Sequence, residues 1–553
     1  MDDFGRLYPG EFLRPDESNI DDLVDKIATI SQRLKSGAES IGGRRPIDST
    51  MRYPEATAYP ALPLRGLTSE QAFTHSLEAF EGAARWHDPM ALFNLVPSPW
   101  LDTVALSTFT SLHNPNAFFD LTSGKVNLLE KRVSRMLGEL AGWPDAVGIA
   151  TSGGKGTLLY AIKAGLNRLD RGFIRRGIHG APVVIASQRC HFSLESICNF
   201  LGLGTDNCIR LPTDTEDRLD LDALEAELLR CHRQGRQVAC VIASGGGTLN
   251  LSIDDVGGIR SLLDAYDAPP YLHFDTVISW AWLLFGADPG HYQSTVRAAD
   301  VLRKIETASA AVRAVRSADS FGADFHKTGL CPAVSSFFVT RTADNLVGTD
   351  DVSPLDEHTQ WGDARYCDVS IENSRSSHGI VSAYHVLMRL GVHGMQDYLS
   401  YLLSVRSVLG ELVERHWKHR FEVVNTRTLG FELVIKIHLH GDRHSYAELA
   451  SAPANVQRDY VARCERFRRF ITFDQHPDGR ADPFIGYVAR YQYGTDSEGL
   501  PAFLLYPISA FIDGTAAAEI LSRLAGACEQ FESAVPDGDC AHDGARLRRE
   551  PPK

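Results

Sequence analysis

The chain of 553 residues lacks a long Lys/Arg cluster and carries a formal net charge of −14. Nucleic acids and anionic membrane surfaces attract proteins through such clusters, so we expect neither as a partner. The longest apolar run, residues 277–286, is too short to cross a bilayer. The first residues, MDDFGRLYPGEFLRPDESN, are acidic and polar, unlike a secretory signal.

Metal-type cysteine spacing is also absent. The ten cysteines form no CxxC pair and no Cys/His cluster, so we expect reduced thiols in a cytoplasmic protein and no metal site. The hydrophobic fraction of 44% is enough for a large core. Length alone predicts about two to four domains.

Apolar spacing divides the chain. Residues 20–36 predict an amphipathic helix, and residues 37–70, rich in Gly, Pro, Ser and Arg, predict an arm. A long helix pattern begins at residue 378, and strand-like pieces and a last helix follow it. We therefore predict an N-terminal helix and wrapping arm (1–95), a large cofactor-binding domain (96–375), a small α+β domain (376–531) and a disordered tail (532–553).

Within the large domain, short apolar runs alternate with helical segments. Strands with so few polar residues imply a sheet that is covered by helices on both faces, an α/β architecture. Such sheets bind ligands at the carboxyl ends of their strands. The predicted strands are residues 146–151, 182–187, 238–244, 270–275 and 335–341.

Lys327 is the most informative single residue. It follows His326 at the end of an apolar segment, beside Phe325 and Leu330, and a Thr-Gly break comes next. A lysine in apolar surroundings loses its proton easily and can attack a carbonyl group. A Schiff base with pyridoxal phosphate requires this property, so Lys327 is a candidate cofactor lysine.

A glycine-rich turn, TSGGKGT at 151–157, lies between a strand pattern and a helix pattern. Free backbone N–H groups and the helix dipole make such a turn an anion cradle, to which Gly153, Gly154 and Lys155 would contribute. A tight turn with a helix cap explains the same residues equally well.

Three further segments follow strand patterns. His191 can stack on an aromatic ring, although a capping or core histidine is the commoner role. The glycines of ASGGGT (243–248) let a ligand approach the backbone closely, or form a flexible loop. Asp275, at a buried strand end, needs a partner such as a protonated pyridine nitrogen, although an aspartate there can also cap the next helix. Arg375 suits a bidentate grip on a substrate carboxylate, with an interdomain salt bridge as the alternative.

The order of these elements resembles the group II pyridoxal-phosphate-dependent amino-acid decarboxylases, of the glutamate and aromatic-amino-acid type. The resemblance covers residues from about 90 to 530. It implies fold type I, the aspartate aminotransferase-like fold, with a mostly parallel central sheet and a smaller C-terminal α+β domain. The segments that carry it are FNLVPSPWLDTVALSTFTSLHNPN, TSGGKGTLLYAIKAG, CHFSLESICNFLG, ASGGGTLNLSIDDV, HFD and ADSFGADFHKTG.

The resemblance also implies roles for residues. Lys327 would form the internal aldimine, and Asp275 would pair with the pyridinium nitrogen. His191 would stack on one face of the ring and act in catalysis, Val277 would press on the other face, and Arg375 would bind the substrate. The remaining cofactor contacts that it implies are Gly153, Gly154, Lys155, Thr248, Ser320, Asp324 and His326.

The chain departs from the family pattern in four places. Lys155 stands where the family usually has Thr or Ser, and residues 276–280 are bulkier than the family's small residues. Extra residues at 287–316 have a helical pattern and suggest an embellishment near the pocket or the dimer seam. In the loop before Arg375, aromatic-amino-acid relatives carry a proton-donating tyrosine. The tyrosine here, Tyr366, comes later than expected, and His358 is another candidate acid.

The leading hypothesis is decarboxylation of an L-amino acid to an amine and CO2 through a quinonoid intermediate. The resemblance implies a homodimer with the active site at the subunit seam. Oxidative decarboxylation with deamination, or C–C lyase chemistry in a specialised pathway, is the alternative, and a non-catalytic protein of the same fold is a third reading. Trp280, Trp282 and Phe325 could line an aromatic substrate pocket or belong to the core.

Overall fold

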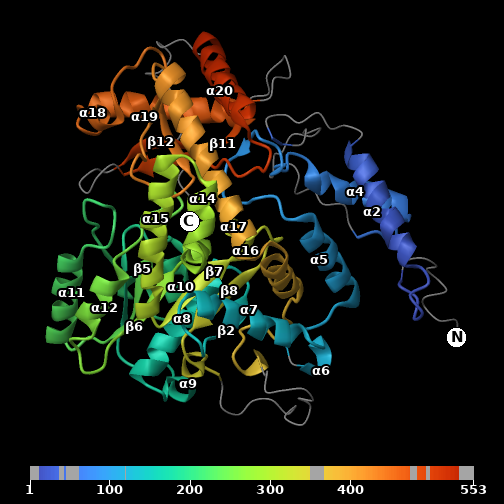
Figure 1. The fold of residues 1–553 in the computed structure, drawn as a ribbon, viewed down its shortest axis with the longest axis vertical. Coiled ribbons are helices and arrows are strands. Elements are labelled where there is room, and N and C mark those ends of the chain that lie inside the picture. The colour runs from blue at the N-terminus through green and yellow to red at the C-terminus, as the bar shows by residue number, and fades with distance from the viewer. Residues whose placement is uncertain are drawn as a thin grey trace.

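The structure is a computed structural model and describes residues 12–35, 43–44, 62–118, 120–348, 366–473, 482–492 and 499–534. A seven-stranded sheet forms the centre of the larger body, with strand order β2-β8-β7-β6-β5-β3-β4 (Figure 1). Of these strands only β8 runs antiparallel to its neighbours, so the expected mostly parallel sheet is confirmed. The strands are β2 (Val147–Thr151), β3 (Val183–Ser187), β4 (Cys208–Leu211), β5 (Val238–Ser244), β6 (Tyr271–Asp275), β7 (Ser320–Asp324) and β8 (Ser336–Thr340).

Helices cover both faces of this sheet, which explains why its strands are apolar throughout. Alternate residues of one strand enter different clusters: Val184 packs with α8 (Gly154–Leu169) and α10 (Ser193–Phe200). Its neighbour Val183 packs with helices on the other face. These are α7 (Val126–Leu140), α11 (Leu221–Arg233), α12 (Val256–Leu263), α15 (Ala299–Val312) and α17 (His378–Leu412).

The strand directions place the carboxyl ends of five strands at one edge of the sheet. β3, β5, β6 and β7 are mutually parallel, and β2 has the same direction because it is antiparallel to β8. Their last residues, Thr151, Ser187, Ser244, Asp275 and Asp324, therefore share the carboxyl edge, where ligands of such sheets bind.

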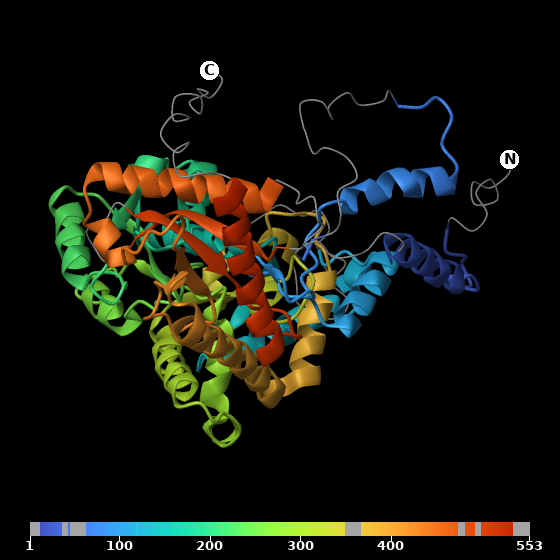
Figure 2. The same cartoon turned by 90° about the horizontal axis from the view of Figure 1, so that it is seen from above.

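A second, five-stranded sheet has the order β1-β11-β12-β10-β9 and packs against α19 (Ala454–Phe473) and α20 (Gly514–Ala534). Towards the N-terminus, α2 (Ile20–Lys35) and α4 (Ser69–Leu77) extend away from the main body (Figure 2). None of the described helices is both long and apolar enough to span a membrane. The strands are β1 (Ala91–Leu92), β9 (Phe421–Val423), β10 (Leu433–Ile437), β11 (Phe484–Tyr491) and β12 (Leu500–Leu505).

The predicted elements match the observed ones closely. The five predicted strands correspond to β2, β3, β5, β6 and β8, the helix at 20–36 is α2, and the extra segment 287–316 contains α15. Strands β4 and β7 were not predicted. Residues 91–92, from the predicted arm, pair with β11 in the smaller sheet. The predicted tail lies almost entirely outside the described residues.

Candidate active site

Lys327 lies directly after β7, in the single turn α16 (Phe325–Thr328). Its Nζ is 2.9 Å from Asp324 Oδ2, and the Asp324 side chain is only 1% exposed. His326 Nε2 is 3.7 Å from the same oxygen. His326 Nδ1 lies 3.3 Å from the Ser335 backbone nitrogen and 3.4 Å from the Ser335 carbonyl oxygen, so Ser335 holds the ring beside Asp324. The Asp324 carboxylate therefore orients both basic side chains.

The glycine-rich turn lies against this lysine turn. Gly153 has φ +115°, which favours glycine, and helix α8 begins at the next residue without a side-chain cap. A Cβ atom on Gly154 would lie 3.1 Å from Asp324 Oδ2 and 3.4 Å from Val277 Cγ1. The uncapped N–H groups of α8 thus begin within a few ångströms of the lysine turn, where they can bind an anion.

Asp275, the last residue of β6, is buried, and its Oδ1 has no hydrogen-bond partner among the described residues. Burial raises the pKa of Asp275 to about 6, and the charge of Lys327 partly opposes this effect. The backbone N–H of Gly245 donates to the Asp275 carbonyl (2.9 Å), and a Cβ atom on Gly245 would lie 2.7 Å from that oxygen. Glycine at position 245 lets the end of β5 lie this close to the backbone of Asp275, the residue whose buried Oδ1 still needs a donor.

His191 lies on the turn after β3. Its Nδ1 accepts a hydrogen bond from the Ser193 backbone N–H (3.2 Å), which leaves the proton of the neutral ring on Nε2. Burial, followed by the positive charges of Lys327 and Lys155, lowers the pKa of His191 to about 4. The imidazole is therefore neutral near pH 7, and the side chains of Lys155 and Lys327 lie close enough to influence it.

Arg210, in β4, holds the His191 turn, and the sequence analysis missed it. Its guanidinium donates to the carbonyl oxygens of Ser187, Cys190 and His191, each at 3.0 Å. Two further hydrogen bonds, of 2.7 and 2.8 Å, join it to the Glu195 carboxylate. An arginine inside the short apolar run CIRL was the available signal, because a charge in a strand needs partners.

The smaller domain holds the loop that contains Thr248. The Tyr506 hydroxyl donates to the Thr248 carbonyl oxygen. The Leu251 backbone N–H donates to Glu432 Oε1 and to Thr428 Oγ1, both at 2.9 Å. Thr248, at the carboxyl side of β5, is thus positioned from outside the seven-stranded sheet.

Ser320 is not brought to this cluster. It begins β7, at the opposite end of the strand from Asp324, and is fully buried. Its Oγ is 2.8 Å from His273 Nδ1, within the sheet. The structure therefore assigns Ser320 a contact inside the sheet, away from the anion cradle.

Arg375 and Tyr366 form a separate buried group. The Arg375 guanidinium binds both carboxylate oxygens of Glu130, at 2.5 and 3.1 Å, and the Ala117 carbonyl oxygen at 2.6 Å. The Tyr366 ring lies 4.8 Å from that guanidinium. These contacts give Arg375 an ion pair within the predicted large domain, rather than the interdomain salt bridge that the sequence left open as the alternative. His358 lies outside the described residues.

The three large aromatic residues belong to the core. Trp280, Trp282 and Phe325 have exposed fractions of 0%. Trp280 packs on Phe325, with ring centroids 4.4 Å apart, and Trp282 stacks on Phe431. None of them offers an exposed surface to a substrate.

The cluster fits pyridoxal phosphate on its own chemistry. A buried carboxylate oxygen without a donor suits a cationic ring nitrogen, the uncapped helix start suits a phosphate group, and an accessible amine suits an aldehyde. The residues that would hold these three groups are Asp275, Gly153 to Lys155, and Lys327.

Comparison with known proteins agrees with this fit. Residues 80–435 match the pyridoxal-dependent decarboxylase conserved domain. The chain is 27% identical over 220 residues to glutamate decarboxylase of Drosophila melanogaster, covering 39% of this chain and 41% of that protein. It is 31% identical over 251 residues to L-2,4-diaminobutyrate decarboxylase of Rhizobium meliloti (strain 1021), covering 45% and 46%. The matches thus span less than half of these curated relatives.

Solved structures share the fold along nearly the whole chain. The apo form of mouse CSAD superimposes with a TM-score of 0.75 at 16% identity, covering 92% of this chain and 99% of that one. Oryza sativa TDC with PLP and tryptamine gives a TM-score of 0.73 at 16% identity, covering 94% and 99%. The expected fold type I architecture is confirmed.

Proposed function

The chain belongs to the pyridoxal-dependent decarboxylase family, and we propose that it removes the α-carboxyl group of an L-amino acid as CO2 and releases the amine. The observation that carries the proposal is the meeting of Lys327, Asp275 and the α8 turn at one edge of the sheet. When bound, pyridoxal phosphate supplies an aldehyde that condenses with amines and a ring that withdraws electrons from the bond to be broken.

Lys327 and Asp324 would act together. As the nearest carboxylate oxygen, 2.9 Å away, Asp324 Oδ2 can take a proton from Nζ and leave the amine free to attack. Throughout turnover the same carboxylate would keep Nζ at the end of β7. Asp324 is therefore proposed as a partner of the lysine rather than as a phosphate contact.

Asp275 and His191 would control charge at the ring. The Asp275 carboxylate, buried and without a donor on Oδ1, gains a partner when a protonated ring nitrogen lies beside it. Neutral His191 adds no positive charge and keeps its proton on Nε2. We propose stacking on the ring as its role, with Val277, next to Gly154, on the opposite face.

The substrate class is proposed as an amino acid, without a role for Arg375. Arg375 is 6% exposed, and the bidentate face of its guanidinium is already occupied by Glu130. We further propose a homodimer in a reducing compartment such as the cytoplasm. Exposed apolar side chains on α5 (Leu101–His113), including Leu101 and Phe109, and nine free cysteines among the described residues support this proposal.

The deciding experiment is incubation of the purified, cofactor-loaded protein with a panel of L-amino acids, followed by measurement of CO2, amine, aldehyde, ammonia and peroxide. We expect CO2 and amine in equal amounts from at least one substrate. Aldehyde with ammonia and peroxide would instead identify the oxidative alternative, and no turnover of any amino acid would favour the non-catalytic reading.

Lys327→Ala should lose turnover by at least about a thousandfold, because no other amine replaces it at the end of β7. Borohydride should attach a pyridoxyl group to the wild-type chain at Lys327 and to nothing in the variant. Lys418→Ala, which removes an exposed lysine at the end of the turn that follows α17, is the matched control. Full activity of Lys327→Ala would reject the assignment.

A further inference from the structure

A second cavity lies at the opposite edge of the seven-stranded sheet from the candidate active site. It lines up with the amino ends of β6 and β7 and with the end of β8, and its volume is about 630 Å3. This volume is within the range of small-molecule sites, roughly 300–1,000 Å3. Its lining residues are Arg168, Arg260, Asp264, Ala268, Pro269, Arg316, Ser317, Asp319 and Arg341.

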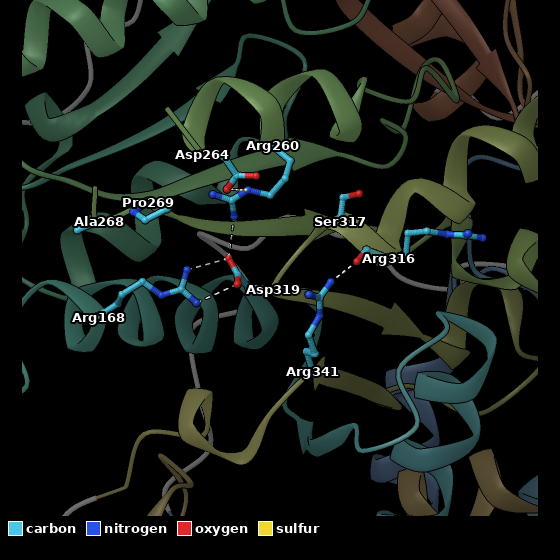
Figure 3. Close-up of a pocket in the computed structure, with 9 residues that line it drawn as sticks. All are labelled: Arg168, Arg260, Asp264, Ala268, Pro269, Arg316, Ser317, Asp319 and Arg341. Carbon is cyan, nitrogen blue, oxygen red and sulfur yellow. Dashed lines mark hydrogen bonds and ion pairs between the residues drawn. The ribbon is translucent and has the colours of Figure 1, made fainter. Parts of the chain in front are cut away.

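The cavity is cationic in an acidic protein. Four arginines and two aspartates give its lining a net charge of +2, whereas the whole chain carries −14. Figure 3 shows the side chains of Arg168, Arg260 and Arg341 on three sides of the Asp319 carboxylate, while Arg316 extends away from it. The local field therefore favours an anion that the rest of the surface repels.

The two aspartates neutralise only part of this charge. Asp319 accepts two hydrogen bonds from Arg168, at 2.9 and 3.0 Å, and one from the Leu272 backbone N–H at 2.8 Å. Asp264 pairs with Arg260 at 2.8 Å, and Arg260 Nη1 also lies 3.6 Å from Asp319 Oδ2. Among the described residues, no carboxylate lies within ion-pair distance of Arg341.

Donor groups remain available in the cavity. Arg260 Nη2 is buried and has no hydrogen-bond partner among the described residues, an unfavourable state that a bound acceptor would relieve. Arg341 donates to the Arg316 carbonyl oxygen through Nη2 and lies 5.4 Å from the Trp143 ring, which leaves its other N–H donors open. Two guanidinium groups thus have unused donors.

We propose that this cavity binds a small phosphate-containing anion between Arg260 and Arg341. Guanidinium groups bind phosphate and carboxylate oxygens in pairs. The Arg168 pair is occupied by Asp319, and the open donors of Arg260 and Arg341 approach from two sides, which suits the four tetrahedral oxygens of a phosphate better than the two coplanar oxygens of a carboxylate. The site is separate from the anion cradle of α8, since it lies at the amino edge and the cradle at the carboxyl edge.

The test is calorimetric titration of the cofactor-loaded, full-length protein with pyrophosphate, and in parallel with succinate. Loading the cofactor keeps the α8 cradle from competing for the probe. We expect one saturable site for pyrophosphate, weakened by added salt, and weaker binding of succinate. Absence of saturable pyrophosphate binding at millimolar concentration, or tighter binding of succinate, would overturn the proposal.

Variants locate the site. Arg341→Gln should weaken pyrophosphate binding about tenfold or more, and Arg341→Lys by less, because it keeps the charge and loses the paired donors. Arg415→Gln, which removes an exposed arginine paired with Glu411 on α17 and the turn after it, should leave binding unchanged. Equal affinity of Arg341→Gln and the wild type would contradict the assignment.

A measurement on the wild-type protein tests the site without depending on whether the variants fold. Phenylglyoxal reacts with accessible guanidinium groups, and peptide mapping identifies the modified residues. Pyrophosphate should slow the modification of Arg341 and leave that of Arg415 unaffected. Identical modification of Arg341 with and without pyrophosphate would reject the site even if every variant failed to fold.

Discussion

Asp324 is the residue on which both Lys327 and His326 depend for their position. Its side chain is almost completely buried, and a carboxylate there is stable only because basic groups face it at 2.9 and 3.7 Å. Replacing the carboxylate removes a proton acceptor from the lysine and a nearby negative charge from the histidine at the same time.

Asp324→Asn should therefore lower kcat/KM by roughly 10- to 100-fold, the loss expected for a hydrogen bond to a charged group. The rate at which the cofactor attaches to the apo-protein, measured by absorbance after mixing, should fall in parallel. Asp397→Asn removes an exposed carboxylate that pairs with His291 and serves as the control. Unchanged attachment kinetics in Asp324→Asn would exclude a proton-accepting role.

Asp275 connects pH to stability in the cofactor-free protein. Its folded pKa is about 6, above the usual 3.8, because burial disfavours the charged form. A raised carboxyl pKa means that stability is highest when the group is protonated and is lost as the pH rises from about 4 through 6. The shift corresponds to about 3 kcal/mol at pH 8 and less at pH 5.

Asp275→Asn should accordingly make the apo-protein more stable than the wild type at pH 8, with a smaller difference at pH 5. Urea unfolding at the two pH values measures this. The same variant should lose most of its turnover when loaded with cofactor, because the amide cannot hold a protonated ring nitrogen. A wild-type apo-protein that is the more stable of the two at pH 8 would contradict the assigned pKa.

At the scale of elements, β4 matters because its arginine holds the turn of its neighbour β3. Arg210 binds three carbonyl oxygens around His191 from a strand that the sequence analysis did not predict. The turn has no other described side chain that binds all three carbonyls, so the imidazole depends on this strand for its position.

Arg210→Gln should reduce cofactor affinity about tenfold and broaden the pH dependence of activity, since His191 would gain exposure to water and its pKa would rise towards 6.5. Titration of the His191 ring by NMR checks the pKa directly. Arg230→Gln, which breaks a comparable bidentate pair with Glu227 on α11, should change neither property. A His191 pKa that stays near 4 in Arg210→Gln would show that the turn holds without its arginine.

Much of the element pattern was predictable, and the exceptions have physical reasons. Buried parallel strands are apolar throughout, so β3, β5 and β6 were predictable from their residue sequences alone. Strand β4, CIRL, has only partly buried residues before Leu211 and an arginine in its middle, so its composition did not predict a strand. Its place depends on pairing with β3, which is a tertiary contact.

For the site, the order of motifs identified Lys327, Asp275, His191 and the α8 turn, which the fold brings to one edge. Ser320 and Arg375 were harder, because their nearest partners are His273 and Glu130, 47 and 245 residues away in the chain. Such distant pairs leave no local pattern in a single sequence.

At the scale of the whole molecule, the two sheets cooperate at the loop after β5. The Tyr506 hydroxyl and the Glu432 carboxylate of the smaller domain bind the backbone of this loop, while Gly245 at its start binds Asp275. Relative displacement of the two domains would therefore shift the backbone at the end of β6.

Tyr506→Phe should lower stability by about 1 kcal/mol and also weaken cofactor affinity several-fold, because the loop loses one support. Tyr401→Phe removes a hydroxyl that also donates to backbone carbonyls, those of Ser509 and Ile512, but does not touch the loop. It should cost similar stability and leave cofactor affinity unchanged. Equal cofactor affinities in the two variants would argue that the loop is held without the smaller domain.

The late position of the antiparallel strand β8 in the sequence determines when β2 can be paired during synthesis. Val147 pairs with Thr340 and Thr151 with Ser336, so β2 has no partner in the sheet until the ribosome has made almost two hundred further residues. At the usual speed of synthesis this takes roughly 10 to 40 s. During that time β2 is unpaired, and chaperones and other nascent chains can bind it. The anion cradle for the cofactor directly follows this strand. The cofactor can be captured only after this late closure, and its arrival then reports that the domain has been completed.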